Sequence, residues 1–273
     1  MSTNDNNINL LRRYFMAVIN IEYYSEVLGM NRKVNVIYPE SSKVEDFTQT
    51  DIPVLYLLHG MSGNENSWII RSGIERLIRH TNLAIVMPST DLGFYVNTTY
   101  GMNYFDAIAH ELPKVINNFF PNLSTKREKS FIAGLSMGGY GAYRLALGTD
   151  HFSYAASLSG VLTFDGMEEN FKENPAYWGG IFGNWETFKG SDNEILSLAD
   201  RKQENKPKLY AWCGKQDFLF PGNEYATAEL KKLGFDITYE SSDGVHEWYY
   251  WTQKIESVLK WLPINYKQEE RLS

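Results

Sequence analysis

The sequence lacks the features that would point to disulfides, membranes or nucleic acids. Cys213 is the only cysteine, so no disulfide can form within the chain, and a reducing compartment is the natural setting. No stretch approaches the about 18 consecutive apolar residues that a membrane-spanning helix needs. The net charge is −7 and no basic stripe is present, which argues against nucleic acid as a partner. We therefore expect a cytoplasmic protein that binds neither membranes nor nucleic acids.

A secretory signal is also lacking at the N-terminus. Residues 1–15 read MSTNDNNINLLRRYF and are mostly polar, and the apolar run at 15–19 is shorter than the about 7 to 15 residues of a signal-peptide core. With 43% hydrophobic and 15% aromatic residues, the remainder can bury a large core, which excludes disorder. We predict a dispensable leader or tag-like extension at 1–15 and a single domain at 16–273.

Eight short segments have the β-branched, aromatic or continuously apolar composition of strands. The first two lie at 18–28 and 32–39 and are expected to pair in antiparallel fashion. The other six lie at 53–60, 83–89, 129–136, 154–162, 208–214 and 236–244. Helical patterns lie among them at 104–120, where Pro113 should bend or restart the helix, and at 141–148, 223–234 and 247–262. This alternation predicts an α/β fold with a mostly parallel sheet of about eight strands flanked by helices.

The segment 163–207 does not follow this alternation. It is polar but rich in aromatic residues, namely Tyr177, Trp178, Phe182, Trp185 and Phe188. Long irregular insertions in compact domains are usually functional or disordered, and the aromatic residues argue against disorder. We predict a small cap over the edge of the sheet; a surface excursion that only covers the core is the alternative.

The stretch FIAGLSMGGYGAYRLAL at 131–147 has the clearest chemical signal. Its GLSMG at 134–138 fits the G-x-S-x-G pattern, with a strand before it and a helix after it, as a nucleophile elbow requires. Glycines allow the sharp turn, and the Ser136 hydroxyl would project beyond the carboxyl end of the strand, where ligands bind in open α/β sheets. Ser136 is therefore the candidate nucleophile; a tight strand-to-helix connection without chemistry is the simpler alternative.

A serine nucleophile needs a base and an acid. His246 lies in the loop after the last predicted strand, at the same end of the sheet as Ser136, and is the candidate base. Asp217 lies in the loop after the preceding strand, which gives the chain order Ser, Asp, His. It would orient His246 and stabilise its imidazolium, although it could also be a helix N-cap. Asp243 is a rival acid whose position fits a turn better.

Two backbone N–H groups should form an oxyanion hole, and other residues should shape the pocket. We expect the N–H groups of Met137 and of Met61, which lies in the loop HGMSGNENSW where Gly60 permits a turn. Gly60, Tyr100 and Trp248 are the candidate substrate-binding residues, though packing alone would also explain Tyr100 and Trp248. No cluster has metal-ligand spacing and no phosphate or dinucleotide loop is present, so neither metal nor cofactor is expected.

Four stretches together resemble the esterase D family of α/β-hydrolases: YLLHGMSGNENSW, FIAGLSMGGYGAYRLAL, WCGKQDFL and GVHEWYYW. Within that family they look most like the tributyrin esterase branch of streptococci and lactic acid bacteria, and the likeness runs from residue 16 to the C-terminus. The resemblance implies the α/β-hydrolase fold and a serine carboxylesterase for short acyl esters. It also implies Ser136, Asp217 and His246 as triad and Met61 and Met137 as the oxyanion hole.

The expected reaction is hydrolysis of a small-molecule ester through an acyl-enzyme intermediate. One alternative is an acyltransferase or a carbohydrate (acetyl or feruloyl) esterase with the same triad. A non-enzymatic, hydrolase-like binding protein is disfavoured because every triad and oxyanion-hole position is filled. The oligomeric state is left open, and a homo-oligomer is compatible with the sequence.

Overall fold

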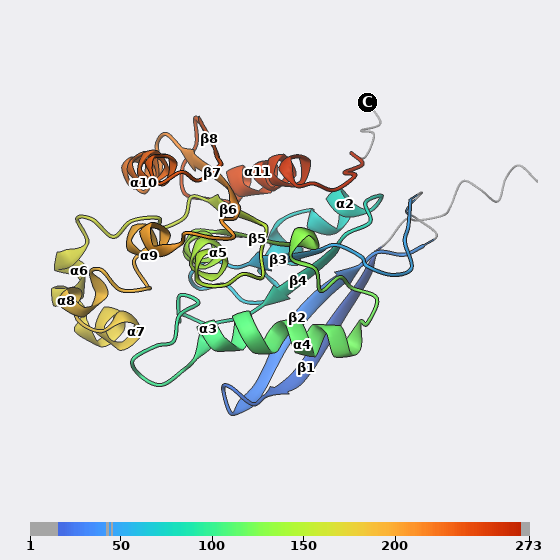
Figure 1. Cartoon of the computed structure of the whole chain (residues 1–273), viewed down its shortest axis with the longest axis horizontal. Helices are drawn as coiled ribbons and strands as arrows, with labels where there is room; N and C mark the ends of the chain where they lie inside the picture. The colour runs from blue at the N-terminus through green and yellow to red at the C-terminus, as the bar shows by residue number, and fades with distance from the viewer. Residues whose placement is uncertain (1–15, 42–43, 45, 269–273) are drawn as a thin grey trace, which may run out of the picture.

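An eight-stranded sheet runs through the computed structural model, which describes residues 16–41, 44 and 46–268. The strand order is β1-β2-β4-β3-β5-β6-β7-β8 (Figure 1). The strands are β1 (Ala17–Ser25), β2 (Met30–Tyr38), β3 (Val54–Leu58), β4 (Ala84–Pro88), β5 (Ser130–Leu135), β6 (Tyr154–Leu158), β7 (Lys208–Gly214) and β8 (Ile237–Ser242). β2 pairs antiparallel with both β1 and β4, and all other neighbours are parallel. The predicted strands and the mostly parallel sheet are confirmed; the predicted leader at 1–15 lies outside the described residues.

The central strands are continuously apolar because both of their faces are buried. Successive side chains of a strand point to opposite faces of the sheet. In β3, Val54, Tyr56 and Leu58 join the core on one face, whereas Leu55 and Leu57 join the core on the other. Such strands need helices on both sides, which is how parallel sheets are normally covered.

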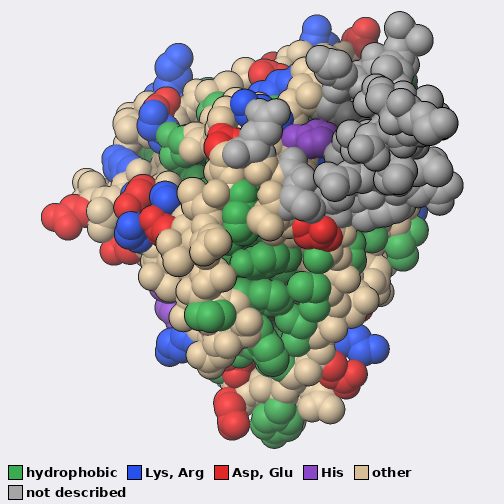
Figure 2. Space-filling model, turned by 90° about the vertical axis from the view of Figure 1, so that its right-hand side faces the viewer, with side chains coloured by type: hydrophobic (Ala, Val, Ile, Leu, Met, Phe, Trp, Pro, Cys, Tyr) green, Lys and Arg blue, Asp and Glu red, His purple; other side chains and the backbone are tan. Residues whose placement is uncertain are grey.

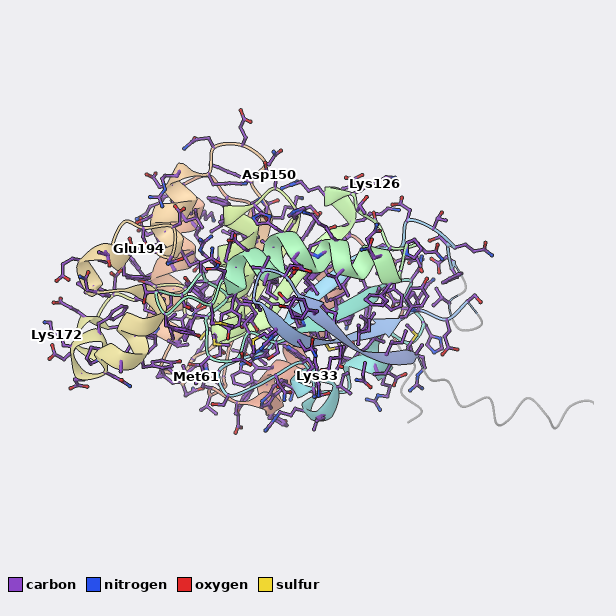
Figure 3. All side chains as sticks on the ribbon, turned by 90° about the horizontal axis from the view of Figure 1, so that it is seen from below. Lys33, Met61, Lys126, Asp150, Lys172 and Glu194 are labelled. Carbon is purple, nitrogen blue, oxygen red and sulfur yellow. The ribbon has the colours of Figure 1, made fainter. Side chains whose placement is uncertain are left out.

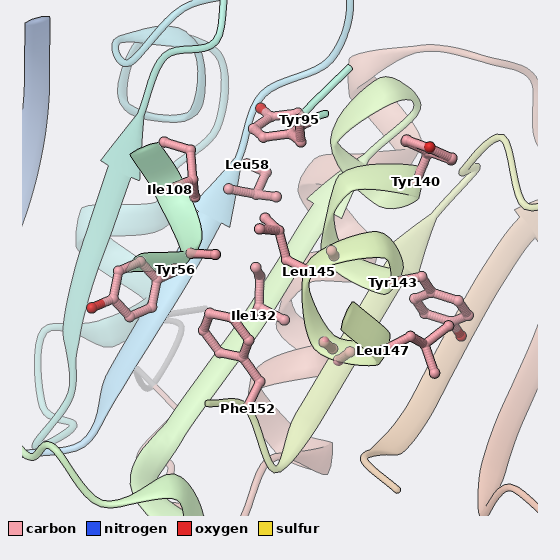
Figure 4. Packing of buried hydrophobic residues seen from close by; sticks show 14 of the residues in the cluster. Tyr56, Leu58, Tyr95, Ile108, Ile132, Tyr140, Tyr143, Leu145, Leu147 and Phe152 are labelled. Carbon is pink, nitrogen blue, oxygen red and sulfur yellow. The ribbon is translucent and has the colours of Figure 1, made fainter. Parts of the chain in front are cut away.

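Helices cover the two faces as that burial requires. One face is covered by α1 (Ser67–Arg71), α2 (Ile74–Ile78) and α11 (Trp248–Trp261). The other is covered by α3 (Tyr104–Asp106), the π-helical η2 (Ala107–Glu111), α4 (Leu112–Phe119), α5 (Met137–Gly148), α9 (Ile195–Arg201) and α10 (Phe220–Lys232). Figure 4 shows Leu145 of α5 packed among Leu58, Ile108 and Ile132. All four predicted helical segments are present.

Pro113 marks a change in the helix that begins at Tyr104. The segment starts as α3, passes through the π-helical η2 and continues as α4, which has Pro113 in its first turn. Proline has no N–H to donate to the preceding turn, so the helical hydrogen-bond pattern changes there. The predicted bend or restart at Pro113 is confirmed.

The segment 163–207 forms a group of short helices rather than an irregular loop. It contains α6 (Glu168–Glu173), the π-helical η4 (Pro175–Gly179), α7 (Gly180–Phe182), α8 (Trp185–Phe188) and α9. Figure 1 shows α6, α7 and α8 together at one end of the molecule. Their aromatic side chains pack on each other and on the core, with Phe164 and Phe188 centred 4.8 Å apart and Phe182 6.0 Å from Tyr140 of α5. This packing explains why a polar segment contains so many aromatic residues.

Some large hydrophobic side chains reach the surface, among them Val18, Tyr24 and Phe119. Figure 2 shows hydrophobic side chains gathered on one face of the molecule. Within the described residues, no helix combines the length and the apolar character needed to cross a membrane.

Candidate active site

Ser136, Asp217 and His246 meet at the carboxyl ends of β5, β7 and β8. Nε2 of His246 lies 2.9 Å from Oγ of Ser136, and Nδ1 of His246 lies 2.9 Å from Oδ2 of Asp217. Parallel strands all end at the same edge of a sheet, so loops far apart in the sequence meet there. The structure thus brings together the three residues that the sequence nominated.

Ser136 is held in a sharp turn between β5 and α5. Its φ of 52° and ψ of −119° lie in a region that non-glycine residues rarely adopt, and such strain costs about 1–3 kcal/mol. The turn requires two glycines. A Cβ on Gly134 would lie 2.3 Å from the carbonyl oxygen of Gly138, and a Cβ on Gly138 would lie 2.6 Å from the carbonyl oxygens of Leu58 and His59. The glycines therefore let the start of α5 pass directly over the end of β3.

Asp217 is fully buried, and its two carboxyl oxygens have different partners. Oδ1 accepts a hydrogen bond of 2.9 Å from the Leu219 N–H, and Oδ2 faces His246. The residue therefore both closes its own turn and orients the histidine. The rival Asp243 is exposed and accepts a hydrogen bond from Gln216 Nε2 at 3.3 Å.

Two aromatic rings flank His246 that sequence reasoning missed. The Phe218 ring lies 4.7 Å from the imidazole, and the Trp251 ring lies 4.9 Å away and nearly perpendicular to it. Trp251 is itself fixed by a 3.0 Å hydrogen bond from its Nε1 to Ser159 Oγ. These contacts restrict the rotation of the imidazole. Phe218 directly follows Asp217 in the sequence, and that adjacency could have indicated that its ring lies near His246.

His59 anchors the loop that follows β3. Its Nε2 accepts a hydrogen bond of 3.1 Å from the Thr90 N–H, so Nδ1 holds the proton and donates it to the Gly60 carbonyl at 2.7 Å. Burial lowers the pKa of His59, which keeps the ring neutral. The Tyr95 hydroxyl donates to the His59 carbonyl at 2.8 Å. His59 is therefore a loop anchor.

That anchor fixes the direction of the Met61 N–H. The Gly60 carbonyl accepts hydrogen bonds from His59 Nδ1 and from the Gly63 N–H, the latter at 3.0 Å. A trans peptide places its C=O and N–H on opposite sides, so the Met61 N–H points away from both donors. A Cβ on Gly60 would lie 3.4 Å from the Cβ of Ser136, which places this loop against the serine.

Met137 begins α5 immediately after Ser136. The first N–H groups of a helix have no acceptor within the helix. The same end of the helix dipole favours negative charge. The Met137 side chain is fully buried, so its backbone is fixed beside Ser136.

A cavity of about 520 Å³ opens beside Ser136 and His246. Its lining residues are Gly60, Met61, Ser62, Gly63, Ser67, Arg71, Leu135, Ser136, His246, Glu247, Trp248 and Trp251. The expected Gly60 and Trp248 are among them. Tyr100 is not: it is exposed, and its N–H donates to the Gly180 carbonyl at 3.1 Å, within the segment 163–207. None of the lining residues comes from that segment.

The cavity also contains two charged residues that the sequence did not reveal. Arg71 ends α1, and its guanidinium lies 5.9 Å from the centre of the Trp248 ring. Glu247 directly follows His246 in the same wall. With the hydroxyls of Ser62 and Ser67, they add polar groups to the lining of the cavity.

Neither a metal site nor a reactive cysteine is found in the part of the chain that the structure describes. No group of three or more His, Cys, Asp or Glu side chains there is placed to hold a metal ion. Cys213 is buried in β7, and burial raises the pKa of its thiol to about 12. A thiol with such a pKa is a poor nucleophile.

Comparisons with known proteins give related hydrolases. The Esterase family model ("Putative esterase") matches residues 25–262. An acetyl esterase from Caldicellulosiruptor saccharolyticus is 32% identical and covers 90% of this chain and 98% of its own. Two Staphylococcus aureus structures are each 34% identical over 90% of this chain and 98% of theirs: the fluorophosphonate-binding serine hydrolase FphF, with a TM-score of 0.82, and the S-formylglutathione hydrolase FrmB, with 0.79.

Proposed function

The chain belongs to the esterase family and is a carboxylic ester hydrolase of the α/β-hydrolase fold, and we propose that it cleaves short-chain acyl esters with Ser136 as its nucleophile. His246 is the proposed base, and Asp217 the group that orients it. The main support is the hydrogen-bonded line from Ser136 Oγ through His246 to Asp217, with both contacts at 2.9 Å.

The proposed reaction has two halves. Ser136 Oγ attacks the acyl carbon while His246 Nε2 accepts its proton, and the buried Asp217 carboxylate stabilises the imidazolium that results. His246 then donates this proton to the departing alcohol, which leaves an acyl-enzyme. Water attacks the acyl carbon with His246 again as base, and the acid and free Ser136 are released.

The proposed oxyanion hole consists of the Met61 and Met137 N–H groups. Each such donor typically lowers the barrier by about 3 kcal/mol. Two observations support the proposal. The helix α5 starts beside Ser136, and the hydrogen bonds to the Gly60 carbonyl fix the Gly60–Met61 peptide so that the Met61 N–H faces away from His59 and Gly63. His59 is then a positioning residue for the hole.

The proposed substrate has a small acyl group and a polar alcohol. The relative named an acetyl esterase supports the small acyl group. Arg71, Glu247, Ser62 and Ser67 in the cavity wall favour a polar alcohol, which includes acetylated saccharides. The polar lining of the cavity is therefore also compatible with a carbohydrate esterase. Membership of the tributyrin esterase branch stays a prediction.

A series of p-nitrophenyl esters from acetate to decanoate tests the proposal. We expect the highest kcat/KM between acetate and butyrate, and loss of activity in Ser136→Ala with an unchanged melting temperature. Equal or better activity on octanoate and decanoate would refute the short-chain proposal. Product ratios with and without added glycerol separate hydrolysis from acyl transfer, because a transferase would form mainly the glycerol ester.

The cytoplasmic location and the oligomeric state remain predictions from the sequence. The single cysteine and the lack of a membrane-spanning helix among the described residues are compatible with that location. Cell fractionation and size-exclusion chromatography measure the two properties directly.

A further inference from the structure

A second cavity lies at the opposite end of the sheet from Ser136. It measures about 200 Å³ and opens beside Val54 and Ser130, the first residues of β3 and β5. Because a strand rises about 3.3 Å per residue, Ser130 and Ser136 are separated by about 20 Å. Lys126 directly follows Thr125, which lines the second cavity, and Figure 3 shows Lys126 on the opposite side of the molecule from Met61 of the Ser136 cavity. The two cavities are therefore separate.

The walls of this second cavity are mostly apolar. Its lining residues are Val54, Tyr56, Pro113, Lys114, Ile116, Asn117, Leu123, Ser124, Thr125, Ser130, His151 and Phe152. Five of them, Val54, Tyr56, Ile116, Leu123 and Phe152, belong to the buried core. An apolar cavity of about 150 Å³ is known to hold benzene, so this one has room for a molecule of that width.

Tyr56 supplies a hydroxyl donor to the lining of this cavity. The side chain is only 6% exposed, and its ring packs against Phe152 with centroids 5.6 Å apart. No hydrogen bond joins its hydroxyl to another described residue, and Figure 4 shows the hydroxyl directed away from Ile132 and Phe152. Burial raises the pKa of Tyr56, so the group stays a neutral O–H donor. The hydroxyl is not among the fully buried unpaired polar atoms, so it reaches the space of the cavity, where a ligand oxygen can accept its hydrogen bond.

The charge around the cavity favours an anion. Lys114 lines the cavity from α4 and has no carboxylate partner within the described residues. The neighbouring carboxylates are already paired, Asp51 with Lys129 at 2.8 Å and Asp150 with Lys202 at 2.5 Å. Lys114 is therefore the cation left available to a ligand.

We propose that this second cavity binds a small apolar monocarboxylate, with an aromatic ring or a chain of about six carbon atoms. The apolar part fills the space between Ile116, Leu123 and Phe152. The carboxylate faces Lys114 and accepts a hydrogen bond from the Tyr56 hydroxyl. The proposal requires no chemistry at Ser136, so it is independent of the proposed esterase mechanism.

Calorimetric titration with sodium benzoate tests the proposal, and benzyl alcohol serves as a neutral molecule of the same shape. We expect one benzoate per chain and binding of benzyl alcohol about fivefold weaker, which is the effect of one exposed ion pair. Equal affinity for the two molecules would overturn the assignment of a carboxylate site.

Benzoate binding to single-residue variants tests whether the ligand occupies this cavity. Lys114→Met and Tyr56→Phe should each weaken benzoate binding about fivefold, and Asn117→Phe should abolish it by filling the cavity. Lys231→Met is the matched control, because Lys231 is an exposed lysine on α10 without a carboxylate partner among the described residues. Melting temperatures verify folding, and Lys114→Met changes only an exposed side chain. Unchanged binding in Lys114→Met and Tyr56→Phe would refute the proposal even if Asn117→Phe failed to fold.

Discussion

Replacing Gly138 by alanine is expected to slow esterase catalysis about 100-fold in a protein that still folds. The new Cβ would lie 2.6 Å from the carbonyl oxygens of both Leu58 and His59. Ordinary contacts begin at 3.4 Å, so the start of α5 must move away from the end of β3 by about 0.8 Å.

The expected loss of rate is large because the start of α5 positions the nucleophile and one N–H group of the proposed oxyanion hole. Ser136 directly precedes the helix, and Met137 is its first residue. A misplacement of about 1 Å among reacting groups can cost about 100-fold in rate. Overpacking costs about 1–3 kcal/mol, and each kcal/mol lowers the melting temperature of a chain this size by about 2–4 °C. We therefore expect a large fall in kcat, little change in KM and a modest fall in melting temperature.

Steady-state kinetics with p-nitrophenyl acetate and a thermal melt measure both effects. Gly179→Ala is the matched control, because Gly179 has a helical φ of −68° and nothing within 4 Å of an added Cβ. That control should keep full activity and gain about 0.4–1 kcal/mol in stability. Wild-type kcat in Gly138→Ala would refute the idea that this close approach positions the nucleophile.

Four further predictions concern single features of the site. Asp217→Asn should lower kcat about 10⁴-fold, because the amide cannot stabilise the imidazolium; a loss below tenfold would argue against Asp217 as the acid. His59→Ala should lower kcat more than it raises KM, since it frees the Gly60 peptide, and the reverse pattern would place His59 in substrate binding instead. Dialysis against EDTA should leave kcat/KM unchanged, because no metal-binding cluster is found among the described residues; a loss restored by metal would contradict this. The Cys213 thiol should react with Ellman's reagent only after unfolding, because burial raises its pKa to about 12; rapid reaction in the native protein would contradict its burial.

The sequence predicts the centre of the sheet well because the central strands are buried on both faces. Continuous apolar runs such as β3 and β5 are unambiguous when helical patterns separate them. Ser136, Asp217 and His246 could be nominated for a related reason. Each follows a strand, and the carboxyl ends of parallel strands share one edge, so chain order alone places them near one another.

Features that depend on long-range packing could not be predicted. Tyr100 was expected at the pocket, but its loop pairs with Gly180, about eighty residues later, and no local pattern encodes that contact. The helices of 163–207 are too short to show helical periodicity. Arg71 lines the Ser136 cavity only because α1 packs beside α11, where its guanidinium meets Trp248.

Fluorophosphonate labelling followed by intact mass spectrometry tests the central claim most directly, because the reagent reacts covalently with an activated serine. We expect one adduct per wild-type chain, mapped to Ser136 by peptide analysis, and none in Ser136→Ala with an unchanged melting temperature. Equal labelling of the two proteins, or labelling of neither, would contradict the assignment of Ser136 as the nucleophile.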